Sequence, residues 1–387
     1  MKIAIIQDDL IRRAGAEQVT LSFHYAFPSA PLYTLTYDPN ATYEEFKKVN
    51  IKTSWFGKFV TKEETMKKFF FPFGVLAMKQ LDLRGYDVIL QSTTHCAKYI
   101  KTNPNALIIT YCHTPFRLVW RPETYESVSN ANFFKKIAYN LVLKILKTID
   151  LKSAKKTHWF LTNSREVVPR IEEAYHPKHV VSVINPSVKC KNFHVEDNIG
   201  DYFLIVSRFE AYKKVDLVIE AFNEMPDKKL IIVGKGSREK EIHAMAGPNV
   251  RFLNSLSTNE LAEVFAKCRA FIFPPLEDYG IAPLEANASG RPVIAYGKGG
   301  VLDTMIPVNE SGVADKATAL FFYEQTKEAI VKAVKEFEKY TFNPQFIRAH
   351  AERFDEEQFV SKIKKFVSEK YEEKHNRNST PTRVVTI

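Results

Sequence analysis

Cysteine is scarce in this chain, and long apolar runs are missing. Only four cysteines occur among 387 residues, and no two of them form a C-x-x-C pair. This spacing indicates neither a zinc site nor a disulfide framework, so we expect a reduced, cytoplasmic setting. No stretch approaches the ~20 apolar residues that a membrane-spanning helix needs. The short apolar run at residues 3–6 ends in two acids, which is not the pattern of a signal peptide.

The remaining composition is typical of a globular protein with more than one domain. Hydrophobic residues make up 45% of the chain and charged residues 26%, which excludes collagen-like and wholly disordered proteins. At about 150 residues per domain, the length predicts two domains or three. No internal repeat and no low-complexity tract is visible.

Positive charge is concentrated in the first half of the chain. Residues 1–185 contain 26 Lys/Arg and 16 Asp/Glu, a net charge of +10 (26 minus 16), which equals that of the whole chain. Such a basic half indicates contact with phosphate, in a nucleic acid, an anionic lipid or a pyrophosphate-bearing substrate. The alternative is a lysine-rich surface that only confers solubility.

Short apolar runs alternate with longer helical patterns, which predicts βαβ units around parallel sheets. The expected fold class is α/β, with two doubly wound halves. Strands are expected at residues 3–6, 88–90, 106–110, 158–162 and 180–184, and then at 202–206, 229–233, 250–253, 270–273 and 292–295.

Composition also predicts the domain boundaries. A linker at 186–200, which contains Pro186 and Gly200, separates the two halves. A helix with apolar residues at helical spacing follows the second half and could cross back to the first. The expected segments are a first domain at 1–185, the linker at 186–200, a second domain at 201–354, the helix at 355–374 and a flexible tail at 375–387.

Two cations follow the first strand of the second half. In open α/β sheets, ligands bind beyond the carboxyl ends of the strands. Arg208 and Lys213 lie there, directly before an expected helix at 215–223. Cations beside a helix N-terminus favour a diphosphate, although solvated side chains are the alternative.

Two glutamates flank a glycine turn further along. Glu277 follows a strand, Gly280 begins a tight turn, and Glu285 falls in the first turn of the next helix. Free backbone N–H groups at 280–284 would hold a phosphate while the carboxylates bind sugar hydroxyls. The structural alternative is that Glu285 only favours the helix dipole and Glu277 is solvated. The G-x-G that contains Gly236 predicts either a close backbone approach to a ligand or an ordinary turn.

These segments resemble those of the retaining GT-B glycosyltransferases of family four. The matching segments in the second half are S-R-F-E-A-Y-K-K-V-D, E-D-Y-G-I-A-P-L-E-A and G-K-G-G-V-L-D. In the first half, R-A-G-A-E, Y-C-H-T-P and T-N-S-R resemble the family's turns and strand ends. The resemblance spans about residues 2–366 and is nearest to mannosyltransferases that build lipid-linked polysaccharide precursors. It implies a GT-B fold, in which two Rossmann-like domains face each other across a cleft.

The resemblance also implies the activity and the roles of single residues. A hexose, first of all mannose from GDP-mannose, would pass from a nucleotide-sugar donor to a glycan acceptor that could be linked to a polyprenyl diphosphate. Arg208 and Lys213 would neutralise the leaving diphosphate, Glu277 would hold the sugar and His113 would lie beside it. Glu285 would hold the ribose. The implied catalytic residues are His113, Glu277, Arg208 and Lys213, and the implied donor-binding residues are Gly15, Gly236, Gly280, Ile281, Ala282, Leu284 and Glu285.

Three positions depart from the family pattern, and a metal motif is missing. Ala14 replaces the first glycine of a usual pair, Lys214 stands where many relatives have glycine, and Asp303 replaces a common glutamate. No D-x-D triplet occurs. Since cationic side chains can replace a metal at the phosphates, we expect neither a metal nor another cofactor.

Two other functions are weaker alternatives. Another enzyme of the same fold, such as a sugar-nucleotide epimerase or a phosphorylase, is one, but no motif marks the pyridoxal-binding lysine of a phosphorylase. A non-catalytic nucleic-acid-binding protein is suggested only by the basic half, without an RNP-like or zinc-finger pattern. We therefore expect no nucleic-acid partner.

Two basic and aromatic stretches fit either an anionic membrane surface or a core-covering role. One is K-K-F-F-F-P-F at 67–73, and the other is an expected helix at 133–156. In that helix the lysines 136, 144 and 147 share one side, and the apolar residues 133, 137, 141 and 145 share the other.

Overall fold

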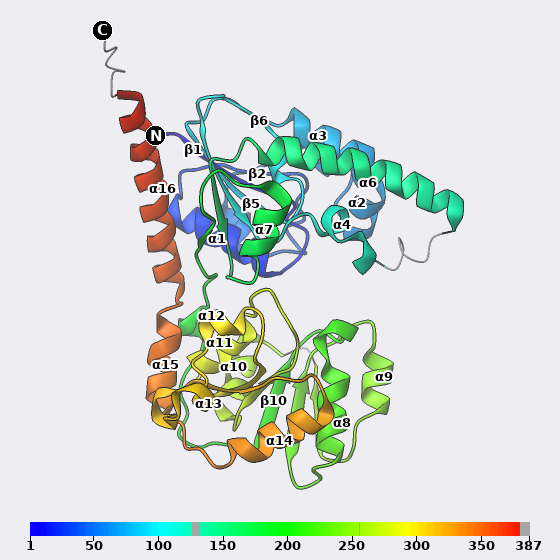
Figure 1. The fold of residues 1–387 in the computed structure, drawn as a ribbon, viewed down its shortest axis with the longest axis vertical. Coiled ribbons are helices and arrows are strands. Elements are labelled where there is room, and N and C mark those ends of the chain that lie inside the picture. Colours follow the sequence, from blue (N-terminus) through cyan, green and yellow to red (C-terminus); the bar gives the residue numbers. More distant parts are fainter. Residues whose placement is uncertain (126–131, 255, 380–387) are drawn as a thin grey trace, which may run out of the picture. The chain divides into compact units, whose positions relative to one another are not determined.

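The computed structural model describes residues 1–125, 132–254 and 256–379. The chain divides into two compact units, which are drawn in Figure 1. Unit 1 comprises Met1–Ile184 and Phe359–Ile387, and unit 2 comprises Asn185–Gln358. Each unit contains a sheet in which every strand pairing is parallel, so the α/β fold class is confirmed.

The sheet of unit 1 has seven strands in the order β3-β2-β1-β5-β7-β8-β9. Its central strands β5 and β7 are buried along their whole length, because helices cover both faces of the sheet. A separate parallel pair joins β4 and β6. The strands of unit 1 are β1 (Ile3–Gln7), β2 (Leu32–Thr34), β3 (Ile51–Thr53), β4 (Asp82–Leu83), β5 (Val88–Thr93), β6 (Lys101–Thr102), β7 (Leu107–Cys112), β8 (Trp159–Thr162) and β9 (Ser182–Val183).

One layer of helices in unit 1 includes the end of the chain. Phe23 and Tyr111 pack in the same apolar cluster as Phe359, Ile363 and Val367, so the last helix completes the core of the unit in which the chain begins. Among the described helices, none is long and apolar enough to cross a membrane. The helices of unit 1 are α1 (Gly15–Ala26), α2 (Glu63–Phe69), α3 (Val75–Gln80), α4 (Arg117–Trp120), α6 (Phe133–Ala154), α7 (Val168–Tyr175) and α16 (Glu356–Ser379), of which Phe359 onward belongs to this unit.

The sheet of unit 2 has six strands in the order β12-β11-β10-β13-β14-β15. Its strands are β10 (Tyr202–Val206), β11 (Lys229–Val233), β12 (Val250–Leu253), β13 (Phe271–Phe273), β14 (Val293–Tyr296) and β15 (Ala319–Phe322). Its helices are α8 (Val215–Asn223), α9 (Glu239–Ala244), α10 (Thr258–Lys267), α11 (Ala282–Ala288), α12 (Val301–Thr304), α13 (Val308–Ser311), α14 (Lys327–Phe337) and α15 (Pro344–Glu352).

The segment expected as a linker packs into unit 2. Val188, Cys190 and Phe193 are buried in one of its apolar clusters, and the backbone of Val188 pairs with that of Asp355. Pro and polar residues favour a linker in composition, but three apolar side chains at this spacing give the segment a core to bury against. The last helix also runs five residues beyond the expected end at 374, to Ser379, and residues 380–387 of the expected tail lie outside the described part.

Two of the family departures have different backbone consequences. Ala14 precedes α1 with φ −148° and ψ 178°, an extended conformation that any residue adopts. Lys214 precedes α8 with φ 56°, in the left-handed region that favours glycine. A glycine at this second position, which the family resemblance implies, would therefore have a conformational reason, whereas Ala14 costs the backbone nothing.

Replacing Lys214 with glycine is expected to stabilise unit 2. Removal of the strained Cβ should add about 0.5–1 kcal/mol, because relief of the left-handed strain exceeds the entropy cost of glycine. Calorimetry should then show a rise of about 1–4 °C in the unfolding temperature. Lys214→Ala keeps the Cβ and serves as the control. Equal midpoints for the two variants would contradict the strain argument.

Candidate active site

The candidate residues of unit 2 follow the carboxyl ends of neighbouring strands. β10 pairs with β13, so the segments that follow them lie side by side. Lys213 follows β10 and Glu277 follows β13, and the Lys213 ammonium makes an ion pair with the Glu277 carboxylate. Both side chains are mostly buried. The structure therefore brings together the predicted phosphate cation and the predicted sugar-binding carboxylate.

Tyr212 connects the second cation to this pair. The guanidinium of Arg208 donates from Nη2 to the Tyr212 hydroxyl oxygen at 2.6 Å. The Lys213 ammonium lies 5.1 Å from the centre of the Tyr212 ring, within the range of a cation–π contact. Arg208 itself is exposed. Tyr212 was not predicted as a site residue, although its position between the two cations in the sequence was a usable signal.

Glycines determine the course of the loop that carries Glu277. Gly280 has φ +84°, and a Cβ there would lie 2.8 Å from the Phe273 ring. A Cβ on Gly300 would lie 2.3 Å from the Tyr279 Cα, and the Gly300 N–H donates to the Glu277 carbonyl oxygen at 2.9 Å. Larger residues at these positions would displace the backbone of Glu277. The glycine turn thus has a packing reason in addition to any contact with a ligand.

Helix α11 begins directly after this turn and carries Glu285. The N–H groups of Leu284 and Glu285 both donate to the Ile281 carbonyl oxygen, at 2.9 and 3.1 Å. A phosphate that binds the Leu284 N–H would have to share this donor with the Ile281 carbonyl oxygen. Gly280 and Ala282, which are also predicted to bind the nucleotide-sugar donor, precede Leu284 in the chain. Glu285 is partly buried, and desolvation raises its pKa to about 7.

Gly236 has a sufficient structural reason in its own loop. A Cβ on this residue would lie 2.6 Å from the Phe209 nitrogen, and the Phe209 N–H donates to the Lys235 carbonyl oxygen at 3.0 Å. The two loops that follow β10 and β11 are therefore in backbone contact. Packing explains this glycine, and its role in donor binding stays a prediction.

In unit 1, the predicted residues Gly15 and His113 follow different strands. Gly15 is exposed at the start of α1, after β1, and His113 follows β7. Because β5 lies between β1 and β7, about 10 Å of sheet width separates the two strands. His113 is buried, its Nε2 lies 2.9 Å from the Ser92 hydroxyl, and burial lowers its pKa to about 4. Its imidazole is therefore neutral near pH 7.

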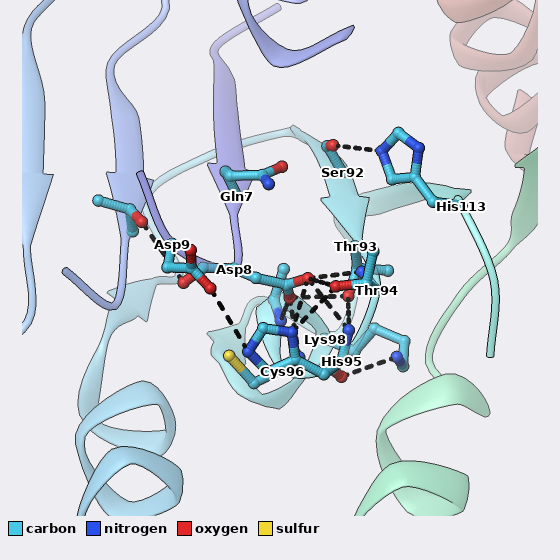
Figure 2. Close-up of polar contacts among 12 residues, drawn as sticks. Gln7, Asp8, Asp9, Ser92, Thr93, Thr94, His95, Cys96, Lys98 and His113 are labelled. Atoms are coloured by element: carbon cyan, nitrogen blue, oxygen red, sulfur yellow. Dashed lines mark hydrogen bonds and ion pairs between the residues drawn. The ribbon is translucent and has the colours of Figure 1, made fainter. Parts of the chain in front are cut away.

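Asp8, directly after β1, is enclosed by the loop that follows β5 (Figure 2). Its Oδ1 accepts from the Thr93 hydroxyl at 2.9 Å and from the backbone N–H of Cys96 at 2.8 Å and of Ala97. Its Oδ2 accepts from the N–H and the hydroxyl of Thr94 and from the N–H of His95. Burial would raise the pKa of Asp8, but His95 and these hydrogen bonds hold it well below the usual range.

The same edge of unit 1 carries further charged side chains, of which the sequence indicates only His95, as a second candidate near a strand end. The Arg12 guanidinium donates to the buried Asp9 carboxylate at 2.7 Å, and the His95 imidazole lies between Asp8 and Asp9, at 3.1 and 3.8 Å. Glu17 is also buried, and within the described residues its Oε2 has no hydrogen-bond partner. Burial and the Asp9 charge raise the Glu17 pKa to about 8. The sequence signal that could have indicated this group is the pair of acids, Asp8 and Asp9, directly after a central strand.

One group of side chains in the described residues has the spacing of metal ligands, namely Asp8, His95 and Cys96. Both oxygens of Asp8 already accept several hydrogen bonds. Burial and the nearby carboxylates raise the pKa of the Cys96 thiol well above its usual value, so the thiolate that a metal needs is disfavoured. The hydrogen bonds of this group therefore fit a structural role better than a metal centre.

Comparison with protein families assigns unit 2 to a class. A family model described as "Glycosyl transferases group 1" matches residues 190–344, which include the cations and both glutamates described above. The chain therefore carries a group 1 glycosyltransferase domain and is a glycosyltransferase. The resemblance found in the sequence is confirmed for this domain.

Individual relatives extend this result along the chain. The chain is 24% identical to "Alpha-1,3/1,6-mannosyltransferase ALG2" of Saccharomyces cerevisiae, across 78% of this chain and 71% of the yeast protein. It is 33% identical to a "GDP-mannose-dependent monoacylated alpha-(1-6)-phosphatidylinositol monomannoside mannosyltransferase" of Corynebacterium glutamicum, across 30% of this chain and 35% of that protein. The crystal structure of Anabaena Alr3699/HepE in complex with UDP and glucose superposes with a TM-score of 0.67 at 15% identity, across 95% of this chain and 99% of that one. This likeness confirms the GT-B fold.

Replacing Asp8 with asparagine is expected to destabilise unit 1 by about 3 kcal/mol, because an amide cannot accept all of the buried donors around it. The three tryptophans, Trp55, Trp120 and Trp159, all lie in unit 1. Their fluorescence in urea therefore reports the unfolding of this unit. Asp82→Asn, at an exposed carboxylate, is the control and should leave the midpoint nearly unchanged. An unchanged midpoint for Asp8→Asn would contradict the importance of this contact.

Nucleotide affinity is expected to depend on pH through Glu285. Because its pKa of about 7 lies close to neutral pH, the carboxylate changes its protonation state within the physiological range. If ribose hydroxyls bind the ionised form, affinity rises with pH and falls by up to about tenfold per unit below the pKa. Titration calorimetry with GDP between pH 6 and 8.5 measures this slope. Glu285→Gln should bind more weakly and lose the part of the slope that Glu285 causes. If the GDP affinities of the parent protein and of Glu285→Gln had the same pH dependence, Glu285 would not be a residue of the nucleotide site.

Proposed function

We propose that this protein transfers mannose from GDP-mannose to a lipid-linked glycan, with retention of the anomeric configuration and without a metal ion. The ion pair of Lys213 and Glu277 carries the proposal, because it combines a phosphate-binding cation and a sugar-binding carboxylate at adjacent strand ends. The relatives support the choice of sugar, since yeast ALG2 is named a mannosyltransferase and the corynebacterial relative is named GDP-mannose-dependent.

The leaving group determines what the cations must do. In the proposed reaction the bond between the anomeric carbon and the phosphate oxygen breaks, and its electron pair leaves with GDP. The acceptor oxygen bonds to the same face of the sugar, and the acceptor proton passes to the departing diphosphate. Arg208 and Lys213 stabilise the negative charge that develops on GDP. Because Glu277 and Tyr212 already hold the Lys213 ammonium, little reorganisation is needed when the phosphate binds.

His113 acts in this proposal through a neutral ring. Because burial lowers its pKa to about 4, it can form a hydrogen bond with a sugar hydroxyl without placing a cation near the anomeric carbon. That carbon becomes positively charged in the transition state, so a neutral partner is favourable.

The finer partners are also proposals. We infer a cytoplasmic enzyme at the cytoplasmic face of a membrane, and the four unpaired, buried cysteines are consistent with that compartment. A polyprenyl-diphosphate-linked glycan would bring its own negative charge to a chain whose first 185 residues carry a net charge of +10 (26 minus 16).

A thermal-shift panel tests the donor first. GDP, UDP, ADP and their common sugars are compared with EDTA present, and a ligand at about 100 times its dissociation constant should add about 2.7 kcal/mol of stability. Stabilisation by guanine nucleotides in EDTA is expected. A response only to uridine nucleotides would overturn GDP-mannose as the donor, and a response that EDTA abolishes would overturn metal-free binding.

Substitutions test the chemistry. Lys213→Ala and Arg208→Ala should each lower kcat by about 100-fold or more, because each removes a cation from the leaving group. Lys214→Ala removes the adjacent lysine and should keep most of the activity. His113→Ala should spare GDP binding and lower kcat. Mannose transfer to a short-chain, water-soluble lipid diphosphate acceptor provides the measurement. Equal losses for Lys213→Ala and Lys214→Ala would contradict the assignment to Lys213.

A further inference from the structure

Helix α6 presents an apolar stripe to solvent. Phe134 is 80% exposed, Ile137 54%, Leu141 61% and Ile145 39%. Their spacing of three or four residues places them on one side of the helix. All residues from 134 to 141 are exposed, and Figure 1 shows this end of α6 extending past the sheet of unit 1. Large apolar side chains gathered in this way indicate a contact surface.

A different side of α6 attaches the helix to unit 1. Leu146 is buried in an apolar cluster, and Asp150 is completely buried. The Asp150 carboxylate accepts from the Lys98 ammonium at 3.1 Å, the Trp120 indole at 3.0 Å and the Tyr175 hydroxyl at 2.7 Å. At ~100° per residue, Leu146 and Asp150 lie more than about 100° around the helix from the stripe. The stripe is therefore a second apolar side, separate from the one that covers the core.

The charges on α6 select the partner. Lys135, Lys136 and Lys144 are exposed, and no acidic residue occurs between Asn132 and Asp150. A basic helix with an exposed apolar side fits the interface of an anionic membrane. A second copy of this chain is a poorer fit, because symmetric pairing of the stripes would bring Lys144, at the edge of the stripe, close to its copy without an acidic partner on this part of the helix.

We propose that α6 inserts this stripe into the interface of an anionic membrane while its lysines contact the lipid phosphates. The inference deepens the proposed function, since it rests on the idea that the acceptor is held in a membrane. The membrane contact is assigned to the first half of α6. The second half of the helix, which is attached through Asp150, holds α6 on unit 1.

Binding to vesicles tests the stripe directly. Full-length protein is sedimented with vesicles of phosphatidylcholine that contain about a quarter phosphatidylglycerol, and with vesicles of phosphatidylcholine alone. The protein should sediment with the anionic vesicles and much less with the neutral ones. The variant Phe134→Gln/Ile137→Gln/Leu141→Gln should lose at least about tenfold in partitioning, and Lys135→Gln/Lys136→Gln/Lys144→Gln should lose about fivefold per lysine. Val180→Gln, at a side chain 80% exposed elsewhere in unit 1, is the matched control.

A fluorescent label tests insertion at the residue itself. The four native cysteines are buried, so Ile137→Cys provides the accessible thiol for an environment-sensitive dye. Its emission should shift to the blue with anionic vesicles, whereas a label at Val180→Cys should not respond. A response of both labels, or of neither, would overturn the proposed surface.

Activity separates this inference from the proposed function. Transfer to a water-soluble acceptor should be unchanged in the Gln triple variant of the stripe, whereas transfer to an acceptor embedded in anionic vesicles should fall with partitioning. Loss of both activities, or sedimentation equal to that of the parent protein, would overturn the docking surface. Light scattering that shows a dimer dispersed by the stripe variant would also overturn it. An absence of mannose transfer in the presence of normal vesicle binding would instead reject the proposed function and leave the surface intact.

Discussion

The carboxylate of Asp8 is the contact on which the candidate site of unit 1 depends. Asp8 follows β1, and the donors around it come from the segment that begins at the end of β5. A buried charge is stable only where such donors compensate its lost hydration. The Thr93–Ala97 segment therefore has to fold around Asp8. This brings the His95 imidazole beside Asp9 and fixes the end of β5, where Ser92 contacts His113.

In unit 2, backbone contacts and not a buried charge fix the positions of the candidate site residues. The loop of Glu277 lies so close to Gly300 that side chains are excluded there, and the hydroxyl of Tyr279 donates to the Pro186 carbonyl oxygen at 2.7 Å. The carboxylate of Glu277 thus extends from a loop with little freedom to move. An ammonium paired with such a carboxylate also has a defined position. This preorganisation is what charge stabilisation at a leaving diphosphate requires.

The sequence predicted best those features that depend on local chemistry. Short, mostly apolar runs predicted β10, β11 and β12 with their observed bounds. The middle of β10 is buried, as a strand inside a parallel sheet requires, whereas β12 at the sheet edge has only partly buried or exposed residues. β2, β3 and β15 were missed: the first two have only three residues each, too few for a pattern. Composition also misjudged the segment after Pro186, since burial of Val188 and Phe193 depends on a surface formed by distant residues. The Asp8 contacts were not predictable for the same reason, because the donors lie more than 80 residues away.

Helix α6 shows what a periodic pattern in the sequence can predict about a helix and what it cannot. Ile137, Leu141 and Ile145 of the expected apolar side are exposed together with Phe134, whereas the side chain of residue 133 lies outside the described part and Lys144 falls on the same side as Ile137. Periodicity alone cannot decide whether an apolar side faces the core or the solvent. The decision comes from Asp150, a single acid in a basic helix, whose burial requires the Lys98 ammonium and three further donors from unit 1. Once Asp150 faces inward, helical geometry turns Ile137 and Leu141 outward. The buried ion pair therefore determines which apolar side of the helix remains exposed for a partner.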